Sequence, residues 1–211
     1  MDTARTSLIT LALSLCLTCT AQQDTLKPVF RDLSEALRTP HLVKRLDLSD
    51  QALQGFPIEV LRFTGLEELR LRRDGITDLP EGIGSLKNLR LLDLSGNPIT
   101  ELPAGIGELT ALEEFYLNDD PLLDLEHDLP TLAKLPRLRV LHLSGDGIER
   151  LPGAIRGLEH LEELYLANNT METFPADLIN LPVLKLIDLH ANPMRPLIPM
   201  ELQQRGVLVR F

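Results

Sequence analysis

The 211-residue sequence contains no tryptophan, and aromatic residues make up only 4% of it. Large aromatic side chains often dominate the buried surface of a core, so this core must be aliphatic. Hydrophobic residues make up 44% of the chain, which is enough for that purpose. The two tyrosines also give little support for glycan binding, because stacking on sugar rings needs aromatic side chains.

Cysteine is almost absent as well. Cys16 and Cys19 are the only two, and both lie in the first 21 residues. Once that segment is cleaved, the mature chain has no disulfide and no thiol nucleophile. A Gly-rich phosphate loop and a G-x-S-x-G motif are also missing. We therefore expect a protein that is not an enzyme and that holds no cofactor.

Positive charge is scarce, since 21 Lys and Arg residues stand against 31 Asp and Glu, for a formal net charge of −10. Binding to nucleic acid requires a concentrated basic face, so this class of partner is not expected. A basic or neutral partner fits better, although an acidic balance also serves solubility.

The first 21 residues have the pattern of a secretory signal peptide. Arg5 precedes an apolar run of ten residues, 8–17, which is short for a bilayer span, and Cys19-Thr20-Ala21 supplies small residues before a cleavage point. We expect an exported protein, located in the periplasm, at the cell surface or outside the cell; a cytoplasmic location fits less well. Cleavage before Cys19 would instead give a lipid-anchored protein, but Cys16-Leu17-Thr18 matches that signal poorly. No second apolar run predicts a transmembrane segment.

The rest of the chain repeats one phrase, L-x-x-L-x-L-x-x-(N/D)-x-(L/I/M). Five of its six intervals are 23 residues and one is 26, with starts at Val43, Leu66, Leu89, Leu112, Leu138, Leu161 and Leu184. Such self-similarity indicates a solenoid in which each unit buries its apolar face against its neighbours.

The repeat at 89–111 shows how one unit is built. Leu92 and Leu94 alternate with polar residues, which predicts a short strand with one buried face. Asn97-Pro98 then turns the chain, and apolar residues at helical spacing return along the outer side. The prediction is an α/β right-handed solenoid with a short parallel concave sheet and short helices or 3-10 turns on the convex side.

The predicted organisation has four parts. They are a signal peptide at 1–21, an N-terminal cap with a short helix at 22–42, seven repeats at 43–206 and a C-terminal capping strand at 207–211. In the cap, Val29, Phe30 and Leu33 are placed on one helical face. The three extra residues of the long repeat are assigned to an outer helix over 129–135.

The repeated phrase followed by L-P-x-x-I resembles the leucine-rich repeat superfamily. It looks like small bacterial members and the Ras-group members that share this outer segment, and the likeness covers about residues 42–205. Departures are Phe56-Pro57 and Phe174-Pro175 for Leu-Pro, and Leu125-Glu126 where Pro is expected. The resemblance implies protein–protein interaction through the concave face.

The Asn position of the phrase carries Asp in three repeats, at Asp74, Asp120 and Asp146. Asn both donates and accepts hydrogen bonds in the turn, whereas an ionised Asp only accepts. These three repeats should therefore be held less firmly than those with Asn.

Two rows on the predicted concave face stand out. The second position of the phrase alternates strictly in sign, which predicts a ladder of ion pairs between neighbouring strands; its members are Lys44, Glu67, Arg90, Glu113, Arg139, Glu162 and Lys185. The central row holds both tyrosines on either side of a histidine; it reads Asp47, Arg70, Asp93, Tyr116, His142, Tyr165 and Asp188.

Tyr and Arg are frequent at interface hot spots, so the central row is the candidate binding site. Its predicted residues are Arg70, Asp93, Tyr116, Asn118, His142, Tyr165, Asn168 and Asp188. The alternative is that the tyrosines and His142 only stack across the strands and stabilise the sheet. A second candidate is the basic group of Arg70, Arg72 and Arg73, which would bind a carboxylate unless Asp47, Asp50 and Asp93 already balance it.

Metal binding is not expected. His142 and His190 lie two strands apart in the predicted sheet, and the acidic residues of the long repeat lack the spacing and the glycine of an EF-hand loop. The leading hypothesis is an exported, monomeric protein-binding module. The alternative is a structural envelope or surface component that self-associates through the solenoid ends or the outer face.

Overall fold

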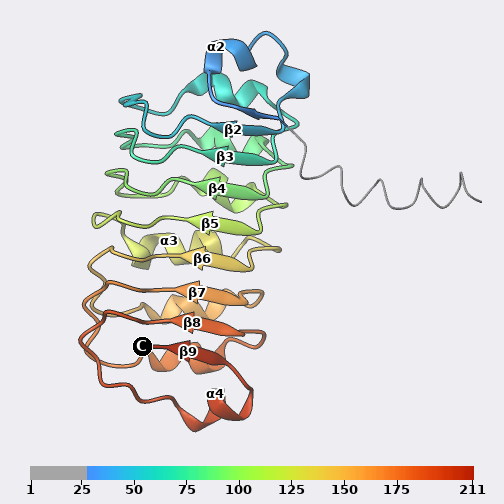
Figure 1. Cartoon of the computed structure of the whole chain (residues 1–211). Helices are drawn as coiled ribbons and strands as arrows, with labels where there is room; N and C mark the ends of the chain where they lie inside the picture. The colour runs from blue at the N-terminus through green and yellow to red at the C-terminus, as the bar shows by residue number, and fades with distance from the viewer. Residues whose placement is uncertain (1–27) are drawn as a thin grey trace, which may run out of the picture.

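The computed structural model describes residues 28–211, and the expected signal peptide with Cys16 and Cys19 lies outside this range. Nine short strands form one parallel sheet in chain order (Figure 1). They are β1 (Val29–Phe30), β2 (Arg45–Asp47), β3 (Glu68–Arg70), β4 (Leu91–Asp93), β5 (Glu114–Tyr116), β6 (Val140–His142), β7 (Glu163–Tyr165), β8 (Leu186–Asp188) and β9 (Leu208–Arg210). The predicted solenoid with a parallel sheet is confirmed.

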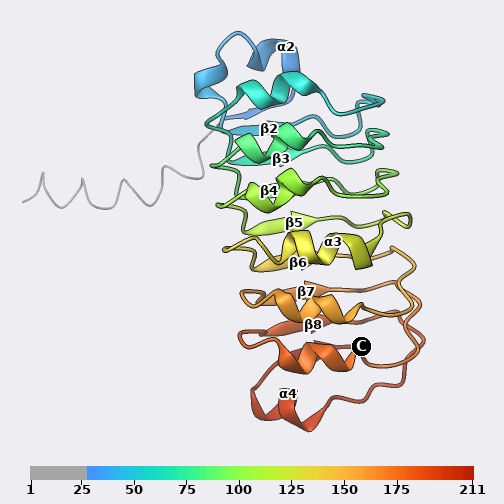
Figure 2. The same ribbon diagram turned by 180° about the vertical axis from the view of Figure 1, so that it is seen from behind.

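Short 3-10 segments cover the other side of the sheet (Figure 2). Five of them follow a proline whose extended backbone turns the chain into the segment; they are η3 (Ile58–Arg62), η4 (Glu81–Ser85), η5 (Ala104–Glu108), η6 (Gly153–Gly157) and η7 (Ala176–Asn180). Segments η4 and η5 lie so close together that a Cβ at Gly105 would collide with the carbonyl oxygen of Glu81, so this position requires glycine.

The N-terminal segment differs in part from the prediction. Helix α2 covers only Leu33–Ala36, after Asp32 has accepted a hydrogen bond from the Glu35 N–H as its N-cap. Val29 and Phe30, which were placed on the helical face, form β1 and pair with β2. The β-branched and aromatic side chains favour a strand here, and η2 (Pro40–Leu42) then leads into β2.

The long repeat and the C-terminal end carry the remaining helices. Helix α3 spans Leu125–Leu132, so the helix placed at 129–135 begins four residues earlier. Asp124 fixes that start, since its side chain accepts from the N–H groups of Glu126 and His127. Helix α4 (Met200–Gln204) precedes β9. Within residues 28–211, no helix is long and apolar enough to cross a membrane.

The core is a stack of mostly aliphatic side chains in register, with Phe63 and Phe115 as its largest fully buried members. The middle residue of strands β2 to β8 is at most 1% exposed; the set is Leu46, Leu69, Leu92, Phe115, Leu141, Leu164 and Ile187. Burying one such side chain contributes roughly 1.5–3 kcal/mol. Because each layer packs only on its neighbours, the sheet holds its outward side chains in straight rows.

A row of Asn and Asp side chains runs inside the turns after the strands. The Asn97 amide nitrogen donates to the carbonyl oxygens of Leu71 and Leu94, and its Oδ1 accepts from the N–H groups of Asp74 and Ile76, both at 3.0 Å. Asn169 makes the same four contacts three repeats further on. These amides therefore tie each turn to the one before it.

Asp120 and Asp146 occupy the same row and make an accepting contact there, but not the donating contacts that the asparagines make. Asp120 Oδ1 accepts from the Asn97 N–H at 2.6 Å, and Asp146 Oδ1 accepts from the Asp120 N–H at 2.9 Å. Their Oδ2 atoms are buried and have no hydrogen-bond partner in the described part of the chain, as is also true of Asp74. Burial raises the pKa of Asp120 to about 8 and that of Asp146 to about 7.

The residue just before this row is left-handed in every repeat. Its φ lies between 53° and 82°, and only two of the seven are glycine; they are Asp50, Arg73, Gly96, Asp119, Gly145, Asn168 and Ala191. Asn, Asp and Gly tolerate this conformation better than other residues. The turn geometry therefore accounts for the residue type at several of these positions.

Candidate functional site

The outward-facing side of the sheet, called the strand face below, corresponds to the predicted concave side. Each strand shows its first and third residues there, because side chains alternate along a strand. The third residues pair in register from Asp47 on β2 to Arg210 on β9. The predicted central row is therefore a continuous row of neighbouring side chains.

The charge alternation at the second position of the repeats appears as ion pairs. Arg90 contacts Glu113 at 3.0 Å, and Lys44 contacts Glu67 at 3.5 Å. Glu162 lies between two cations, with Arg139 at 2.9 Å and Lys185 at 2.5 Å. Hydrogen bonds from these two lower the pKa of Glu162 to about 2. This row is occupied with internal pairing.

Tyr116, His142 and Tyr165 form a continuous stack in the centre of the strand face. The His142 ring lies 4.1 Å from each tyrosine ring, with interplanar angles of 13° and 4°. All three side chains are half-buried. Each phenol is held at its tip, because Tyr116 donates to Glu114 at 3.0 Å and Tyr165 donates to Glu163 at 2.7 Å. The stack is therefore a fixed aromatic surface.

The environment of the stack keeps its three groups uncharged near neutral pH. Burial lowers the pKa of His142 to about 4, so the imidazole carries no proton charge. Burial and the nearby Glu114 raise the pKa of Tyr116 to about 12. The hydrogen bond to Glu163, together with burial, raises the pKa of Tyr165 to about 12.

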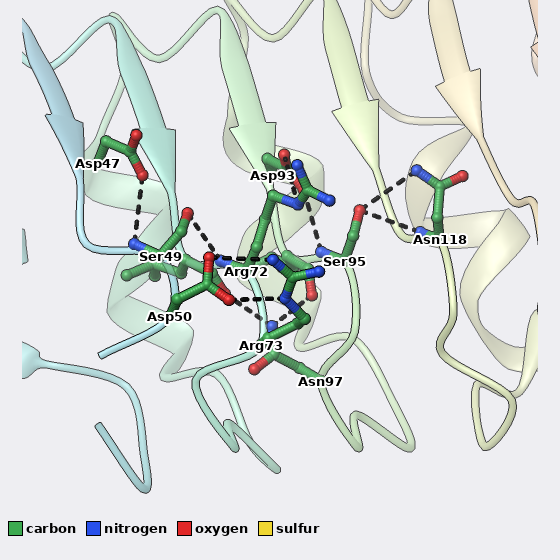
Figure 3. Close-up of polar contacts among 11 residues, drawn as sticks. Asp47, Ser49, Asp50, Arg72, Arg73, Asp93, Ser95, Asn97 and Asn118 are labelled. Atoms are coloured by element: carbon green, nitrogen blue, oxygen red, sulfur yellow. Dashed lines mark hydrogen bonds and ion pairs between the residues drawn. The ribbon is translucent and has the colours of Figure 1, made fainter. Parts of the chain in front are cut away.

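The basic group near the N-terminal end is balanced within the chain, and Figure 3 shows this for Arg72 and Arg73. Arg73 forms two bonds to Asp50, at 2.6 and 3.1 Å, and Arg72 lies 3.7 Å from Asp93. Arg70 contacts Glu68 at 3.1 Å and not one of the expected partners, Asp47, Asp50 and Asp93. These contacts favour the structural interpretation of Arg72 and Arg73 over a carboxylate site.

Two predicted site residues, Asp93 and Asp188, lie in the scaffold. Each is 7% exposed, and each accepts from the backbone N–H two residues later, Asp93 at 3.1 Å and Asp188 at 3.2 Å. Asp47 makes the same contact to Ser49 at 3.2 Å (Figure 3). Aspartate in this row therefore closes the end of its strand.

The two predicted asparagines, Asn118 and Asn168, also have structural roles in the turns after the strands. Asn118 donates to Ser95 Oγ at 3.3 Å and accepts from the Ser144 N–H at 3.0 Å, so its amide joins three successive repeats. Asn168 is exposed and occupies the left-handed position of its turn, with φ of 55°. The structure thus brings Tyr116, His142 and Tyr165 together and places Asn118 and Asn168 at the edge of that group.

The first residues of strands β5, β6 and β7, which lie beside the stack, were not among the predicted site residues. Glu114, Val140 and Glu163 are register partners on β5, β6 and β7 and are half-buried. The signal was present, because each glutamate lies two positions before a tyrosine and so shares its face of the strand. In the described range, 28–211, no three His, Cys, Asp or Glu side chains gather as metal ligands.

The chain belongs to the leucine-rich repeat family. The family model described as "Leucine rich repeat" matches twice, at residues 64–122 and 136–194, which together cover more than half of the chain. Proteins of this family commonly serve as protein-interaction modules. No curated protein matches the sequence.

Solved structures with the same fold include a leucine-rich repeat protein of Leptospira interrogans, which is 25% identical with a TM-score of 0.57 over 87% of this chain and 58% of that one. The plant peptide hormone receptor RGFR1, solved in complex with RGF2, is 26% identical with a TM-score of 0.55, over 80% of this chain and 28% of the receptor. The Toll–Spatzle complex of Drosophila is similar in fold, at 22% identity and a TM-score of 0.63, over 77% of this chain and 22% of the neighbour. This chain thus spans between about a fifth and three fifths of the length of these proteins.

Proposed function

We propose that this chain is an exported, non-enzymatic module that binds a protein partner through the strand face, centred on Tyr116, His142 and Tyr165. The observation that carries the proposal is the aromatic stack, a rigid and partly apolar surface that lies beside a row of ion pairs on the same face. Partly exposed aromatic side chains surrounded by polar groups are typical of interface hot spots.

The comparisons are consistent with this role. One similar structure is a receptor bound to a peptide hormone, and another is a complex between Toll and Spatzle. A short parallel sheet that presents straight rows of side chains offers an extended surface of the kind solenoids use for binding. Arg70 completes the proposed site at its N-terminal side. It lies in the same row as Tyr116, two strands away, with Asp93 between them. Asp93, Asp188, Asn118 and Asn168 support this surface in the proposal.

The test is affinity capture with the purified chain against envelope and medium proteins, followed by binding measurements on the captured protein. Tyr116→Ala with Tyr165→Ala should weaken binding by about 1000-fold, because hot-spot truncations each cost about 2 kcal/mol or more and about 1.4 kcal/mol corresponds to tenfold. The same double variant should keep the circular dichroism spectrum of the wild type, since the aliphatic core is untouched.

The matched control removes exposed apolar surface elsewhere. Ile58→Ala with Leu122→Ala truncates two side chains that are 55% and 58% exposed and lie outside the sheet. This control should bind like the wild type. Undiminished binding by the tyrosine double variant would exclude the strand face as the site.

A second candidate function is a structural component that self-associates through the C-terminal end of the solenoid. The observation that favours it is the apolar surface there, with Leu197, Met200 and Leu208 at 73%, 68% and 52% exposure. Light scattering over a concentration series separates the two proposals. A mass that stays at one chain supports the monomeric binding module, and a mass that grows with concentration supports self-association.

A further inference from the structure

Two carboxylates beside the aromatic stack lack the internal cation that Glu68 and Glu162 on the same face have. Glu68 has Arg45 at 2.9 Å and Arg70 at 3.1 Å, and Glu162 has Arg139 and Lys185. Among residues 28–211, Glu114 and Glu163 have no such ion-pair partner and accept only from the phenols of Tyr116 and Tyr165.

No group of residues 28–211 that is packed around them forms an ion pair with either carboxylate. The two phenols are neutral donors, and His142 between them is neutral because burial lowers its pKa to about 4. Arg139 bonds to Glu162 at 2.9 and 3.1 Å and attracts Glu163 only at longer range, without an ion-pair contact. On the neighbouring strands the charges are paired with one another, because Arg70 contacts Glu68, Arg72 lies 3.7 Å from Asp93 and Arg210 lies 3.9 Å from Asp188. The centre of the strand face is therefore a half-buried anionic site.

The neighbouring row shows what this arrangement lacks. At the second repeat position, the repeats that contain β5, β6 and β7 place Arg139 between Glu113 and Glu162. One residue later, the same strands place Val140 between Glu114 and Glu163. Since neighbouring strands lie about 4.8 Å apart, the two glutamates begin about 10 Å apart with an apolar floor between them. The two rows therefore differ at the centre, where the second-position row has Arg139 and the first-residue row of the strands has Val140.

We propose that the partner presents a lysine or arginine side chain that lies over Val140, with its charged end between Glu114 and Glu163. Such a side chain buries its aliphatic stem on the valine and on the edges of the rings while its head group reaches the carboxylates. An exposed charge of the partner is favoured here because the carboxylates are already half-desolvated and fixed by the phenols. The inference rests on the proposed function, as it assigns the partner chemistry of the same site.

The experiment selects peptides from a displayed library of random 12-residue sequences on the immobilised full-length chain. Selected peptides are then made with a fluorescent label and measured by anisotropy against the wild type and three variants. Glu114→Gln with Glu163→Gln removes the two charges and keeps the size of the side chains. Val140→Lys supplies a cation from the chain itself. Glu159→Gln with Glu172→Gln makes the same charge change at exposed positions outside the sheet.

The expected result is that selected peptides share a lysine or arginine whose replacement by glutamine weakens binding at least tenfold. Glu114→Gln with Glu163→Gln and Val140→Lys should each weaken the same peptides at least tenfold, and the distant glutamine pair should not. The loss should shrink as salt is raised from 50 to 300 mM, because the contact is electrostatic.

Two outcomes overturn the inference in different ways. Peptides that require Tyr116 and Tyr165 but bind the Glu114→Gln/Glu163→Gln variant as tightly as the wild type exclude the basic side chain and leave the proposed function standing. A selection that yields no peptide, or only peptides indifferent to both pairs of substitutions, removes the strand face as the binding site and the inference with it.

Discussion

Replacing Asp120 by asparagine should stabilise the solenoid, and more so as the pH rises. In the row of buried turn side chains, Asn97 donates through its amide nitrogen to two carbonyl oxygens, whereas the corresponding second oxygen of Asp120 is buried without a partner. Asn at position 120 would restore a donor and remove a buried titratable group. The free energy of unfolding should therefore increase.

The pH window follows from the direction of the pKa shift. Burial raises the pKa of folded Asp120 from 3.8 to about 8, so the folded chain holds a proton that the unfolded chain releases. Stability from this group is fully present below about pH 4 and is lost as the pH rises toward 8. Each pH unit inside the window changes the free energy of unfolding by about 1.4 kcal/mol. Between pH 5 and pH 8, the gain from Asp120→Asn should grow by about 3–4 kcal/mol.

Urea unfolding followed by circular dichroism at pH 5 and pH 8 measures this gain for wild type and variant. Asp78→Asn is the matched control, because it removes the same charge at an exposed position and should change little at either pH. An equal gain at both pH values would refute the assignment of the pH dependence to Asp120. So would a loss of stability at pH 8.

Three further substitutions probe neighbouring features. Asp146→Asn should behave like Asp120→Asn, with a window that ends near pH 7, and the same urea series at pH 7 and pH 8 should show no further growth in its gain. Asn97→Ala removes four hydrogen bonds inside the turns and should lower the free energy of unfolding by about 3–5 kcal/mol, measured at pH 7; a cost below 1 kcal/mol would contradict the role given to this row. His142→Phe keeps the stack. The wild type should lose stability as the pH falls from about 6.5 through 4, a pH dependence opposite in sign to that of the aspartates, and the variant should not. Parallel curves of unfolding free energy against pH for the two proteins in that range would exclude this role of His142.

Much of the scaffold could be predicted because one local pattern is repeated. The alternation of Leu92 and Leu94 with polar residues fixes which side of a strand is buried, and a constant period of mostly 23 residues then brings equal positions into register. The central row and the Tyr–His–Tyr neighbourhood follow from that register alone. The family assignment also follows, because the repeated leucines are the features that define it.

The chemistry of individual positions was less accessible. Asp93 is a charged residue on the strand face, as expected of a binding residue, but it accepts a hydrogen bond from the Ser95 N–H. That contact depends on where the strand ends. Val29 and Phe30 fit a helical face by spacing, yet an open edge on β2 makes a strand the better use of their backbone groups. Glu114 was overlooked because its importance depends on its register partners. The partner on β6 is Val140 and the next one, on β7, is Glu163, so neither position carries a cation.

The stacking of Tyr116, His142 and Tyr165 has a consequence for the thermodynamics of recognition. The rings are 4.1 Å apart, closer than the roughly 4.8 Å between strands, so they lean together and each limits the rotamers of the next. Side chains that are already immobile lose little entropy when a ligand covers them. Calorimetry of such an association should therefore show a small entropic penalty from this surface, and the conformational cost of complex formation should fall mainly on the other molecule.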